Sequence, residues 1–547
     1  MSLNSSDPSI APTKIPSIIV SKSPTIIPSF VPLNKTTNSN LPQGFSATWF
    51  NNRVQVPRAL YVTPGGNVLV VDTVASTLSN GVLALFPDGS SFLIAQPPSS
   101  DPTLTHGVTV NKDKVYASTA TTVYQWSYTE GQTSVSLNPV PVITNMPSGG
   151  YTTRPLAFDS KGLLYVEVGA QTTTAGVDSS NVRSKIKSFD ITVGSPLNWN
   201  NGQDIAVGIR NSPGIAFDRL DSLWVADIQV NAFPSNFRPD LGIASQLIEN
   251  YPAGRLIRIS SQLVLNYGYP YCWSEGNISS PYSRGTTDKL FSYNLTIHND
   301  SWCRSNTQPA TLNLFPHASP TGLTFFNAKK TLDPSCPAGS AFPSSYDGDL
   351  FLALHGSISR TPPSGYTVLH VPIDSISGLP GVPTVFLSSK DTSFSGYPKW
   401  VNGFRPTDVK FDKCNRLLIS SDGTVNSQNQ RIGAGVMIIS YNQIIESTFS
   451  PTILPSFAPN SDNNDNNHNR SGVSTGVVAG SVIAAFVFGL IVSYVVYYFF
   501  AKRNNDNTLN SIQSNTKHSA LDDHNDNESE ISSSAPDERE AFSINMK

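Results

Sequence analysis

Six short loops of this 547-residue chain carry arginine, histidine or tyrosine side chains, and each loop leads into a short apolar run. They contain Arg58, His106, Tyr151-Thr152-Thr153-Arg154, Arg210-Asn211, His317 and Arg405. Arginine offers a planar fork of donors that matches a carboxylate, and neutral histidine can accept a proton near pH 7. If the fold brings the loops together, they form a polar, partly basic site for an anionic ligand or cofactor. The alternative is that single arginines only bridge neighbouring elements.

The segments that follow these loops share one pattern: a short apolar strand, a turn containing Gly or Asp, and a second apolar strand. The six pairs are 58–62 with 67–71, 107–110 with 114–117, 155–158 with 163–166, 214–217 with 223–226, 322–325 with 349–352, and 407–411 with 416–419. Several continue into a third strand, as at 81–85, 122–126 and 255–259.

Repeats at this spacing, mostly roughly 50 residues, indicate a β-propeller, because each small sheet cannot bury both faces alone. Six repeats predict an all-β fold of six blades over residues 42–446. In a propeller the loops that lead into the first strands converge on one mouth of the central channel. We therefore expect the basic loops to meet there.

The composition bounds the class of protein. The 36 basic and 39 acidic residues give a net charge of -3, so we expect no nucleic-acid partner. The 41 prolines and 37 glycines are typical of an extracellular all-β protein with many turns.

Proline-rich segments flank the propeller at 1–41 and within 447–476, and residues 23–32 are closely repeated at 450–459. Proline at every fourth position forbids a helix and favours an extended chain. We interpret these segments as stalks that carry O-glycans or, alternatively, as plain disordered flanks.

Residues 477–501 contain no charged side chain and are long enough for one transmembrane helix. Lys502 and Arg503 follow directly and predict a cytoplasmic C-terminus, with 502–547 as a disordered acidic tail. This topology predicts a single-pass plasma-membrane protein with an extracellular propeller. The first 40 residues lack the pattern of a secretory signal, so we expect a sequence truncated at its start, unusual targeting being the alternative.

Cysteines and glycosylation sequons support secretion. Four cysteines allow three disulfide pairings, of which we favour Cys272–Cys303 and Cys336–Cys414; four free buried thiols are the alternative. Sequons occur at Asn34, Asn277, Asn294 and Asn299. The last three lie in the long gap between the fourth and fifth repeats, which we interpret as a glycosylated excursion from one face.

Several short motifs occur in a fixed order. They are His106-Gly107; Met146-Pro147-Ser148-Gly149-Gly150 before Thr153-Arg154; Arg210-Asn211 with Leu223-Trp224; 266–270; 317–322; 355–360 with Gly365-Tyr366; and Phe404-Arg405-Pro406. In this order they resemble the pyrroloquinoline-quinone (PQQ)-dependent sugar dehydrogenases, especially the fungal pyranose dehydrogenase and sorbosone dehydrogenase branch.

The resemblance implies a site and a mechanism. PQQ would lie over the channel mouth, with its carboxylates on arginines and its quinone oxygens on Ca²⁺, which acts as a Lewis acid. A histidine would remove the hydroxyl proton of a sugar or other polyol while hydride passes to PQQ. Motif matching assigns PQQ contacts to Arg210 and Asn211, then to Arg360 and Arg405. An electron-acceptor protein is a further expected partner.

Two positions depart from the family. Tyr151 stands where family members usually carry the histidine after Gly-Gly, and ionising a phenol at pH 7 costs about 4 kcal/mol. His106 or His317 could substitute as the base. The family's acidic, Gly-rich metal loop here reads Ala226-Asp227-Ile228-Gln229-Val230-Asn231, which leaves the backbone carbonyls of Gln229 and Val230 as calcium ligands.

Three hypotheses follow. The first is a membrane-anchored cell-surface PQQ-dependent sugar dehydrogenase. The second is a catalytically inactive propeller that binds carbohydrate or protein. The third, a calcium-dependent lactonase on a similar scaffold, fits the ordered motifs less well.

Overall fold

The computed structural model describes residues 38–73, 80–172, 182–231, 233, 238, 240, 251–259, 263–276, 282–357, 359–360, 362–390, 400 and 402–442. Several expectations lie outside these residues: both proline-rich segments except 38–41, the span 477–501, the tail 502–547, and the sequons at Asn34 and Asn277. Within the described ranges, no helix has both the length and the apolar character needed to span a bilayer.

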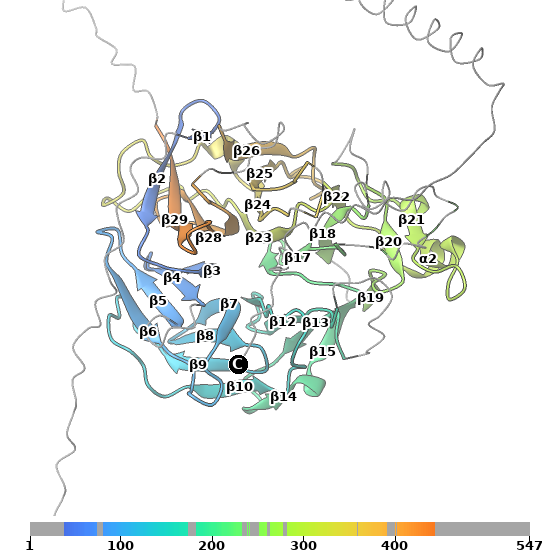
Figure 1. Ribbon diagram of the computed structural model, residues 1–547. Helices are drawn as coiled ribbons and strands as arrows, with labels where there is room; N and C mark the ends of the chain where they lie inside the picture. The colour runs from blue at the N-terminus through green and yellow to red at the C-terminus, as the bar shows by residue number, and fades with distance from the viewer. Residues whose placement is uncertain are drawn as a thin grey trace, which may run out of the picture. The chain divides into compact units, whose positions relative to one another are not determined.

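In the described part of the chain, six blade sheets, each with four antiparallel main strands, form the propeller, and Figure 1 shows how they are arranged around a common centre. In the order of the chain their strands are β3 (Pro57–Val62), β4 (Val68–Asp72), β5 (Gly81–Leu85) and β6 (Ser91–Ala95); β7 (Leu104–Asn111), β8 (Lys114–Thr119), β9 (Val123–Ser127) and β10 (Val140–Thr144); β11 (Leu156–Phe158), β12 (Leu164–Val168), β13 (Lys185–Phe189) and β15 (Gln203–Val207); β16 (Gly214–Phe217), β17 (Leu223–Asp227), β18 (Gly254–Ile259) and β22 (Leu312–Leu314); β23 (Pro320–Phe325), β24 (Leu350–Leu354), β25 (Thr367–Val371) and β26 (Thr384–Ser389); and β27 (Pro406–Phe411), β28 (Leu417–Val425), β29 (Arg431–Tyr441) and β2 (Phe45–Asn51).

The first strands of the six sheets contact one another in a closed ring, in the order β3, β7, β11, β16, β23, β27 and back to β3. Short strands extend three of the sheets: β1 (Ser39–Asn40) pairs with β26, β14 (Leu197–Asn198) with β10, and β19 (Leu265–Asn266) with β15. The predicted six-bladed β-propeller is confirmed.

An N-terminal strand closes the ring. β2 pairs antiparallel with β29, from Phe45 opposite Tyr441 to Asn51 opposite Val436. The ring of Phe45 packs edge-on against Phe342 at 4.7 Å and against Phe386 at 5.0 Å, between centroids. The last blade therefore depends on the start of the domain for its outer strand. The strand patterns in the sequence did not indicate this pairing.

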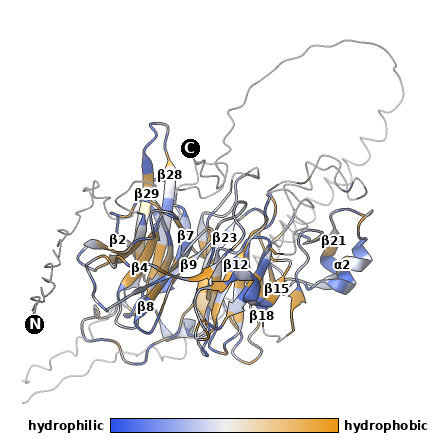
Figure 2. Cartoon of the chain, turned by 90° about the horizontal axis from the view of Figure 1, so that it is seen from below, coloured by the Kyte–Doolittle hydropathy of each residue, from blue (hydrophilic) through white to orange (hydrophobic). Residues whose placement is uncertain are grey.

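The core lies between the blades. Every residue of β4 and of β24 is buried, because each of these sheets is covered on both faces by its neighbours. Figure 2 shows apolar strands within the body of the propeller, while the β28–β29 hairpin extends beyond the other strands.

Two glycines let the inner strands touch through their backbones. A Cβ on Gly214 would lie 2.0 Å from the carbonyl oxygen of Thr321, and one on Gly322 would lie 2.3 Å from the Cα of Asp408. Real Cβ atoms do not approach other atoms so closely. Glycine is thus required where β16 meets β23 and where β23 meets β27.

A disulfide-linked excursion lies between β19 and β22. It contains β20 (Cys272–Ser274) paired with β21 (Leu290–Ser292) and the short helix α2 (Asp300–Asn306), tied by the disulfide Cys272–Cys303. The second disulfide joins Cys336 to Cys414. The favoured pairing is confirmed.

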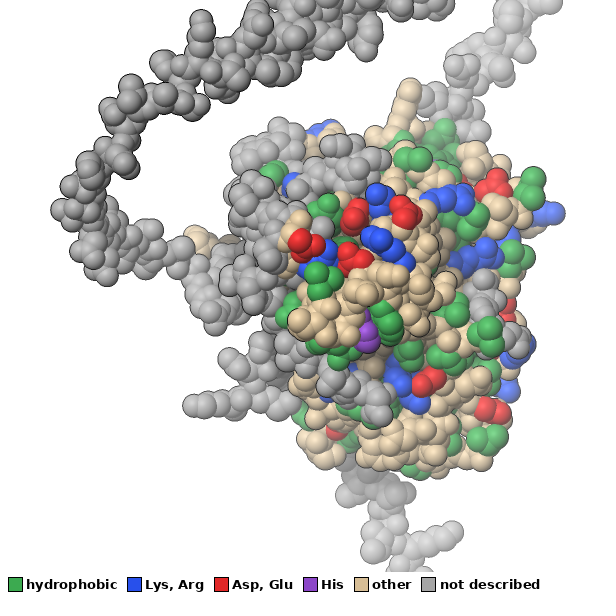
Figure 3. Space-filling view, turned by 90° about the vertical axis from the view of Figure 1, so that its right-hand side faces the viewer, with side chains coloured by type: hydrophobic (Ala, Val, Ile, Leu, Met, Phe, Trp, Pro, Cys, Tyr) green, Lys and Arg blue, Asp and Glu red, His purple; other side chains and the backbone are tan. Residues whose placement is uncertain are grey.

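Two of the sequons lie in the described part of this excursion. The side chain of Asn294 accepts hydrogen bonds from the amide and hydroxyl of Thr296, at 2.9 and 2.7 Å, and Asn299 caps α2. Figure 3 looks onto this side of the molecule, and it shows basic and acidic side chains interspersed among the described residues in view.

Gly214→Ala is expected to lower the free energy of unfolding by about 1–3 kcal/mol, because the new methyl group must push β16 away from β23. Urea denaturation of the purified protein measures this change. Gly381→Ala is the matched control, because its Cβ would meet atoms of Pro372 only at ordinary distances of 3.6–3.7 Å. Equal stability of the two variants would contradict the backbone contact.

Candidate active site at the channel mouth

The mouth is formed where first strands begin and second strands end. Arg58 lies at the start of β3 and His106 near the start of β7. The loops before β11, β16, β23 and β27 carry the predicted residues Tyr151, Arg210, Asn211, His317 and Arg405. Arg360 follows β24, and Gln229 and Val230 follow β17. The second strands add Asp72, Asp227, His355 and Asp422 to the same end of the blades, and these were absent from the predicted site residues. The sequence signal that could have identified them is a polar residue near the end of each second apolar run, or directly after it.

Carboxylates at the ends of second strands hold the loops that precede the first strands. The Asp72 carboxylate accepts hydrogen bonds from the backbone N–H groups of Gln55 and Val56 at 2.9 and 2.8 Å. Asp227 accepts those of Arg210 and Asn211, both at 3.0 Å. Since buried backbone donors must be satisfied, these carboxylates fix where each loop passes the mouth.

Arg154 organises the loop that carries Tyr151. Its guanidinium is fully buried and donates to four backbone carbonyl oxygens, those of Ala120 (3.1 Å), Pro147 (2.9 Å), Tyr151 (2.6 Å) and Thr153 (2.8 Å). Burial lowers the pKa of Arg154 to about 10, so it remains a cation at neutral pH. These donors are used inside the protein, and Arg154 holds the loop.

Tyr151 is held by Arg210. The Nη2 atom of Arg210 donates to the phenol oxygen at 2.5 Å, and the guanidinium carbon lies 4.6 Å from the centre of the ring. The Tyr151 amide donates to Ala170 at 2.9 Å. The side chain and backbone of Tyr151 therefore have fixed partners from blades three and four.

Asn211 is oriented by Thr153. The Thr153 hydroxyl donates to Asn211 Oδ1 at 2.8 Å, an assignment that turns the amide nitrogen away from Thr153. Beneath this pair, Arg255 forms a buried ion pair with Asp227. The backbone of Asn211 and its side chain are both fixed, as a ligand contact requires.

The predicted calcium loop is engaged by an arginine. Arg210 Nη1 donates to the carbonyl oxygen of Gln229 at 2.7 Å and to that of Ile228 at 3.2 Å. The Gln229 side chain turns inward and donates to Asp227 at 2.6 Å, and Val230 packs in the core. Among the described residues no group of three or more His, Cys, Asp or Glu side chains could hold a metal ion.

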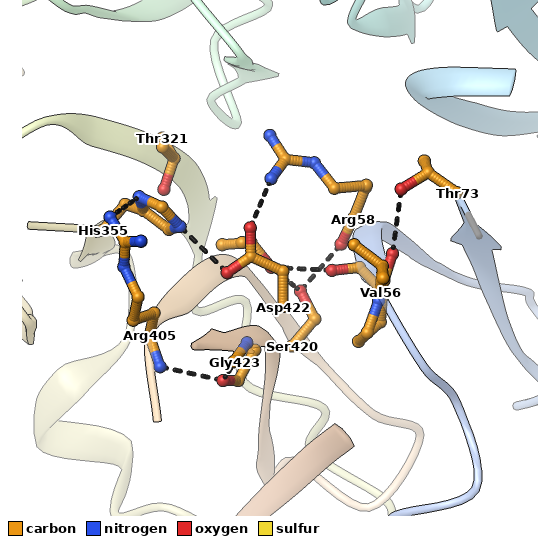
Figure 4. A network of polar contacts seen from close by, with 12 residues as sticks. Val56, Arg58, Thr73, Thr321, His355, Arg405, Ser420, Asp422 and Gly423 are labelled. Atoms are coloured by element: carbon orange, nitrogen blue, oxygen red, sulfur yellow. Dashed lines mark hydrogen bonds and ion pairs between the residues drawn. The ribbon is translucent and has the colours of Figure 1, made fainter. Parts of the chain in front are cut away.

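A second polar network crosses blades one, five and six (Figure 4). Asp422 lies between Arg58, whose Nη1 is 2.7 Å from one carboxylate oxygen, and His355, whose Nε2 is 2.9 Å from the other. Arg405 Nη2 lies 3.1 Å from His355 Nδ1 and donates to the carbonyl of Gly356 at 3.2 Å. The neighbouring arginines and His355 hold the pKa of Asp422 below its usual range, despite burial.

The two proposed substitute bases differ. His106 is buried, and its Nδ1 has no hydrogen-bond partner among the described residues. Burial, then the charges of Arg58 and Lys410, lower its pKa well below the usual value, so it is neutral at pH 7. His317 is nearly buried and has a left-handed backbone, with φ of 58°.

Arg360 packs its guanidinium carbon 5.0 Å from the ring of Phe315, and its Nη1 donates to the carbonyl of Pro362 at 2.8 Å. Glu167, which the sequence did not single out, is also buried, and both of its carboxylate oxygens lack partners among the described residues. Burial raises the pKa of the Glu167 carboxyl well above its ordinary value.

The fold and the mouth define a six-bladed β-propeller with an arginine-rich channel mouth. Residues 39–427 match the family described as TrAA12-like, and the chain belongs to this family of PQQ-dependent sugar dehydrogenase propellers. The resemblance expected from the ordered motifs is confirmed.

The relatives include a PQQ-dependent pyranose dehydrogenase of Coprinopsis cinerea, 25% identical over 376 residues, which cover 65% of this chain and 48% of that protein. The chain thus spans about half the length of that relative. A PQQ-dependent sugar dehydrogenase of Hypocrea jecorina is 25% identical over 410 residues, 70% of this chain and 86% of that protein.

Solved structures share the fold. The holo form of the pyranose dehydrogenase PQQ domain from Coprinopsis cinerea superposes with a TM-score of 0.59 at 23% identity, covering 74% of this chain and 97% of that one. A calcium structure of a Trichoderma reesei protein of family AA12 gives 0.59 at 20% identity, covering 75% and 98%.

Arg154→Met is expected to destabilise the protein by about 3–5 kcal/mol, because it leaves the carbonyl acceptors of the Tyr151 loop without their donors. Thermal unfolding measures the loss. Arg53→Met, at an exposed arginine, should change stability by less than about 0.5 kcal/mol. Similar unfolding temperatures for both variants would show that Arg154 does not organise the loop.

Proposed function

We propose that this protein is a membrane-anchored, cell-surface PQQ-dependent dehydrogenase that oxidises a hydroxyl group of a sugar or other small polyol. Membership of the family supports the cofactor and the class of substrate. The observation that carries the proposal is the buried Nε of Arg405, which has no hydrogen-bond partner among the described residues.

The residues of the mouth fit an anionic cofactor. Arg405 uses Nη2 on His355 and Gly356, whereas its Nε is buried without a partner among the described residues. An unsatisfied buried donor costs about 1–3 kcal/mol, and a ligand carboxylate would satisfy it. Arg405 would therefore hold a carboxylate of PQQ, with Asn211 and Arg360 as further contacts. When bound, PQQ supplies the hydride acceptor.

The protein must also accept the hydroxyl proton. Arg210 donates to the Tyr151 oxygen, so this phenol is held as a hydrogen-bonding group. His106 is neutral and its Nδ1 is without a partner among the described residues, which leaves a lone pair for a proton. We propose that His106 replaces the family histidine as base, and that Tyr151 orients the substrate. The low pKa of His106 makes it a weak base.

Calcium assistance does not fit the loop as it stands. A cation already donates to the Gln229 carbonyl, and Ca²⁺ on the same oxygen would lie close to the Arg210 charge. Calcium binding by the carbonyls of Gln229 and Val230 therefore requires the Arg210 guanidinium to move away from the Gln229 carbonyl oxygen. No step of the proposed reaction depends on calcium.

The cellular setting is part of the proposal. The uncharged span 477–501 supports a single-pass plasma-membrane protein with an extracellular propeller, and two disulfides support an oxidising compartment. N-glycans on Asn34, Asn277, Asn294 and Asn299 and an electron-acceptor protein as partner belong to the same proposal.

A catalytically inactive propeller that binds carbohydrate or protein is the second candidate. The fixed Tyr151–Arg210 contact favours it, because the sequence resemblance implies a base at position 151 and a phenol held by Arg210 stands there. PQQ binding without turnover would identify this second function.

The purified protein is expected to bind PQQ and to reduce a dye when sugar is added. Tyr151→Phe should raise KM and keep kcat within about tenfold, because it removes an orienting hydroxyl and not the base. His106→Gln should lower kcat by about 10²-fold or more, because it removes the proton acceptor. Stopped-flow or steady-state dye reduction measures both. Loss of turnover in Tyr151→Phe alone would assign the proton to Tyr151, and no PQQ binding by the wild type would refute the proposed function.

Calcium is expected to bind Arg210→Gln at least about tenfold more tightly than the wild type, because the competing guanidinium is gone. Isothermal titration with CaCl₂ measures both affinities. Arg219→Gln, at an exposed arginine in the turn after β16, is the control and should behave as the wild type. Tight calcium binding by the wild type, unchanged in Arg210→Gln, would contradict the competition.

A further inference from the structure

Side chains from three blades are connected by hydrogen bonds in the network around Asp422. Arg58 begins on β3, Asp422 lies in β28, His355 follows β24, and Arg405 precedes β27 (Figure 4). The side chains of Arg58, Asp422 and His355 are exposed by only 5%, 11% and 4%. Since water hardly reaches them, their protonation states must agree with one another.

The donors and acceptors of this network have one consistent arrangement. A guanidinium only donates, so His355 Nδ1 must accept from Arg405. The proton of neutral His355 then sits on Nε2 and is donated to Asp422. Both carboxylate oxygens of Asp422 are engaged, since Arg58 donates to the second one.

Asp422 is also fixed through its backbone. Arg431 Nη1 donates to the Asp422 carbonyl at 2.7 Å, and the amide of Arg405 donates to the hydroxyl of the preceding residue, Ser421, at 2.8 Å. The carboxylate thus cannot turn away from His355 without breaking several contacts. A fixed carboxylate fixes the histidine tautomer, and the tautomer decides whether His355 Nδ1 can accept from Arg405, in addition to the carbonyl of Gly356.

We propose that Asp422 and His355 are positioning residues that hold Arg405 with its remaining donors available to an anionic ligand at the channel mouth, and that protonation of His355 releases Arg405. The inference rests on the proposed function, in which Arg405 holds a carboxylate of PQQ. Asp422 and His355 were not among the expected cofactor contacts, and the proposal does not place either of them in contact with the cofactor.

Protonation reverses the arrangement because His355 Nδ1 becomes a donor that faces another donor. The charged groups around His355 are Arg405 and Arg58, which oppose its charge, and Asp422, which favours it. Burial is the largest influence, followed by Arg405, and the pKa of His355 falls to about 4. Arg405 therefore keeps His355 Nδ1 as an acceptor at neutral pH and loses it as the pH falls toward 4, which leaves the carbonyl of Gly356 as its partner.

The linkage to stability has a definite sign. The folded pKa of His355 lies below the ordinary value of 6.5, so the unfolded chain binds more protons between pH 6.5 and about 4. Stability from this group is complete above pH 6.5 and is lost as the pH falls through this window. Asp422 has a lowered pKa as well, and its contribution is lost at still lower pH.

The test is PQQ binding to the full chain, titrated by fluorescence between pH 4 and pH 8. Wild-type affinity should fall about tenfold or more below pH 5. His355→Gln carries an amide donor and acceptor but cannot titrate, so it should bind within a few-fold of the wild type at pH 7 and lose much less at pH 4. His355→Phe and Asp422→Asn should bind about 10- to 100-fold more weakly at pH 7.

A matched control separates this role from general packing. His370 also pairs with a carboxylate, with Nε2 2.7 Å from Asp349, but lies on the third strand of blade five. His370→Gln should therefore keep the acid loss of PQQ binding. Protonation of PQQ itself is common to all variants, so differences between variants report on the protein.

Two outcomes would overturn the positioning role: the same acid loss in His355→Gln as in the wild type, or full affinity in His355→Phe at pH 7. If the wild type binds no PQQ at any pH, the proposed function fails. The proton arrangement of the network is then tested by the unfolding temperature. This temperature should fall as the pH is lowered from 6.5 to 4 in the wild type, and it should fall less in His355→Gln. Equal pH dependence would refute the arrangement.

Discussion

The closed ring of first strands is the constraint on which the rest of the structure depends. Six strands that meet around one axis bring the loops before them into a small, largely buried region. Backbone amides and charged side chains there lose water and must find partners in the protein. Carboxylates at or near the ends of second strands meet this need: Asp72 and Asp227 hold backbone amides, and Asp422 holds Arg58 and His355. The glycines of the inner strands belong to the same constraint, since a side chain there would open the ring.

Burial divides the arginines of the mouth by role. Arg154 gives its donors to carbonyls and fixes the Tyr151 loop. Arg210 ties Tyr151 to the loop after β17, and its charge occupies the carbonyl expected to bind calcium. Arg405 is held at one nitrogen and keeps a buried Nε without a partner among the described residues. One residue type thus supplies a structural clamp, a bridge and, in the proposed function, an anion contact, and only the partners distinguish them.

Tyr151 is the position at which the sequence resemblance implied a histidine. The family model establishes the family, and the mouth of this chain has a phenol bound by an arginine at that position. The proposed function needs another proton acceptor, and His106 Nδ1 has no hydrogen-bond partner among the described residues. The network of Asp422, His355 and Arg405 lies on other blades, so the proposals assign ligand positioning and proton removal to separate parts of the mouth.

The sequence by itself determined the blades, the family and the loops that reach the mouth. Local patterns were sufficient for these, because strand, turn and loop residues are neighbours in the chain. The sequence left three disulfide pairings open, and the structure has the favoured one. Only the tertiary structure decided the closure of β29 by β2, the partners of Arg210 and the pairing of His355 with Asp422. These contacts join residues 18 to about 400 positions apart, as between Arg210 and Ile228 and between Phe45 and Tyr441. A hydrogen bond depends on distance and direction in space, and spacing along the chain does not encode either for residues that far apart.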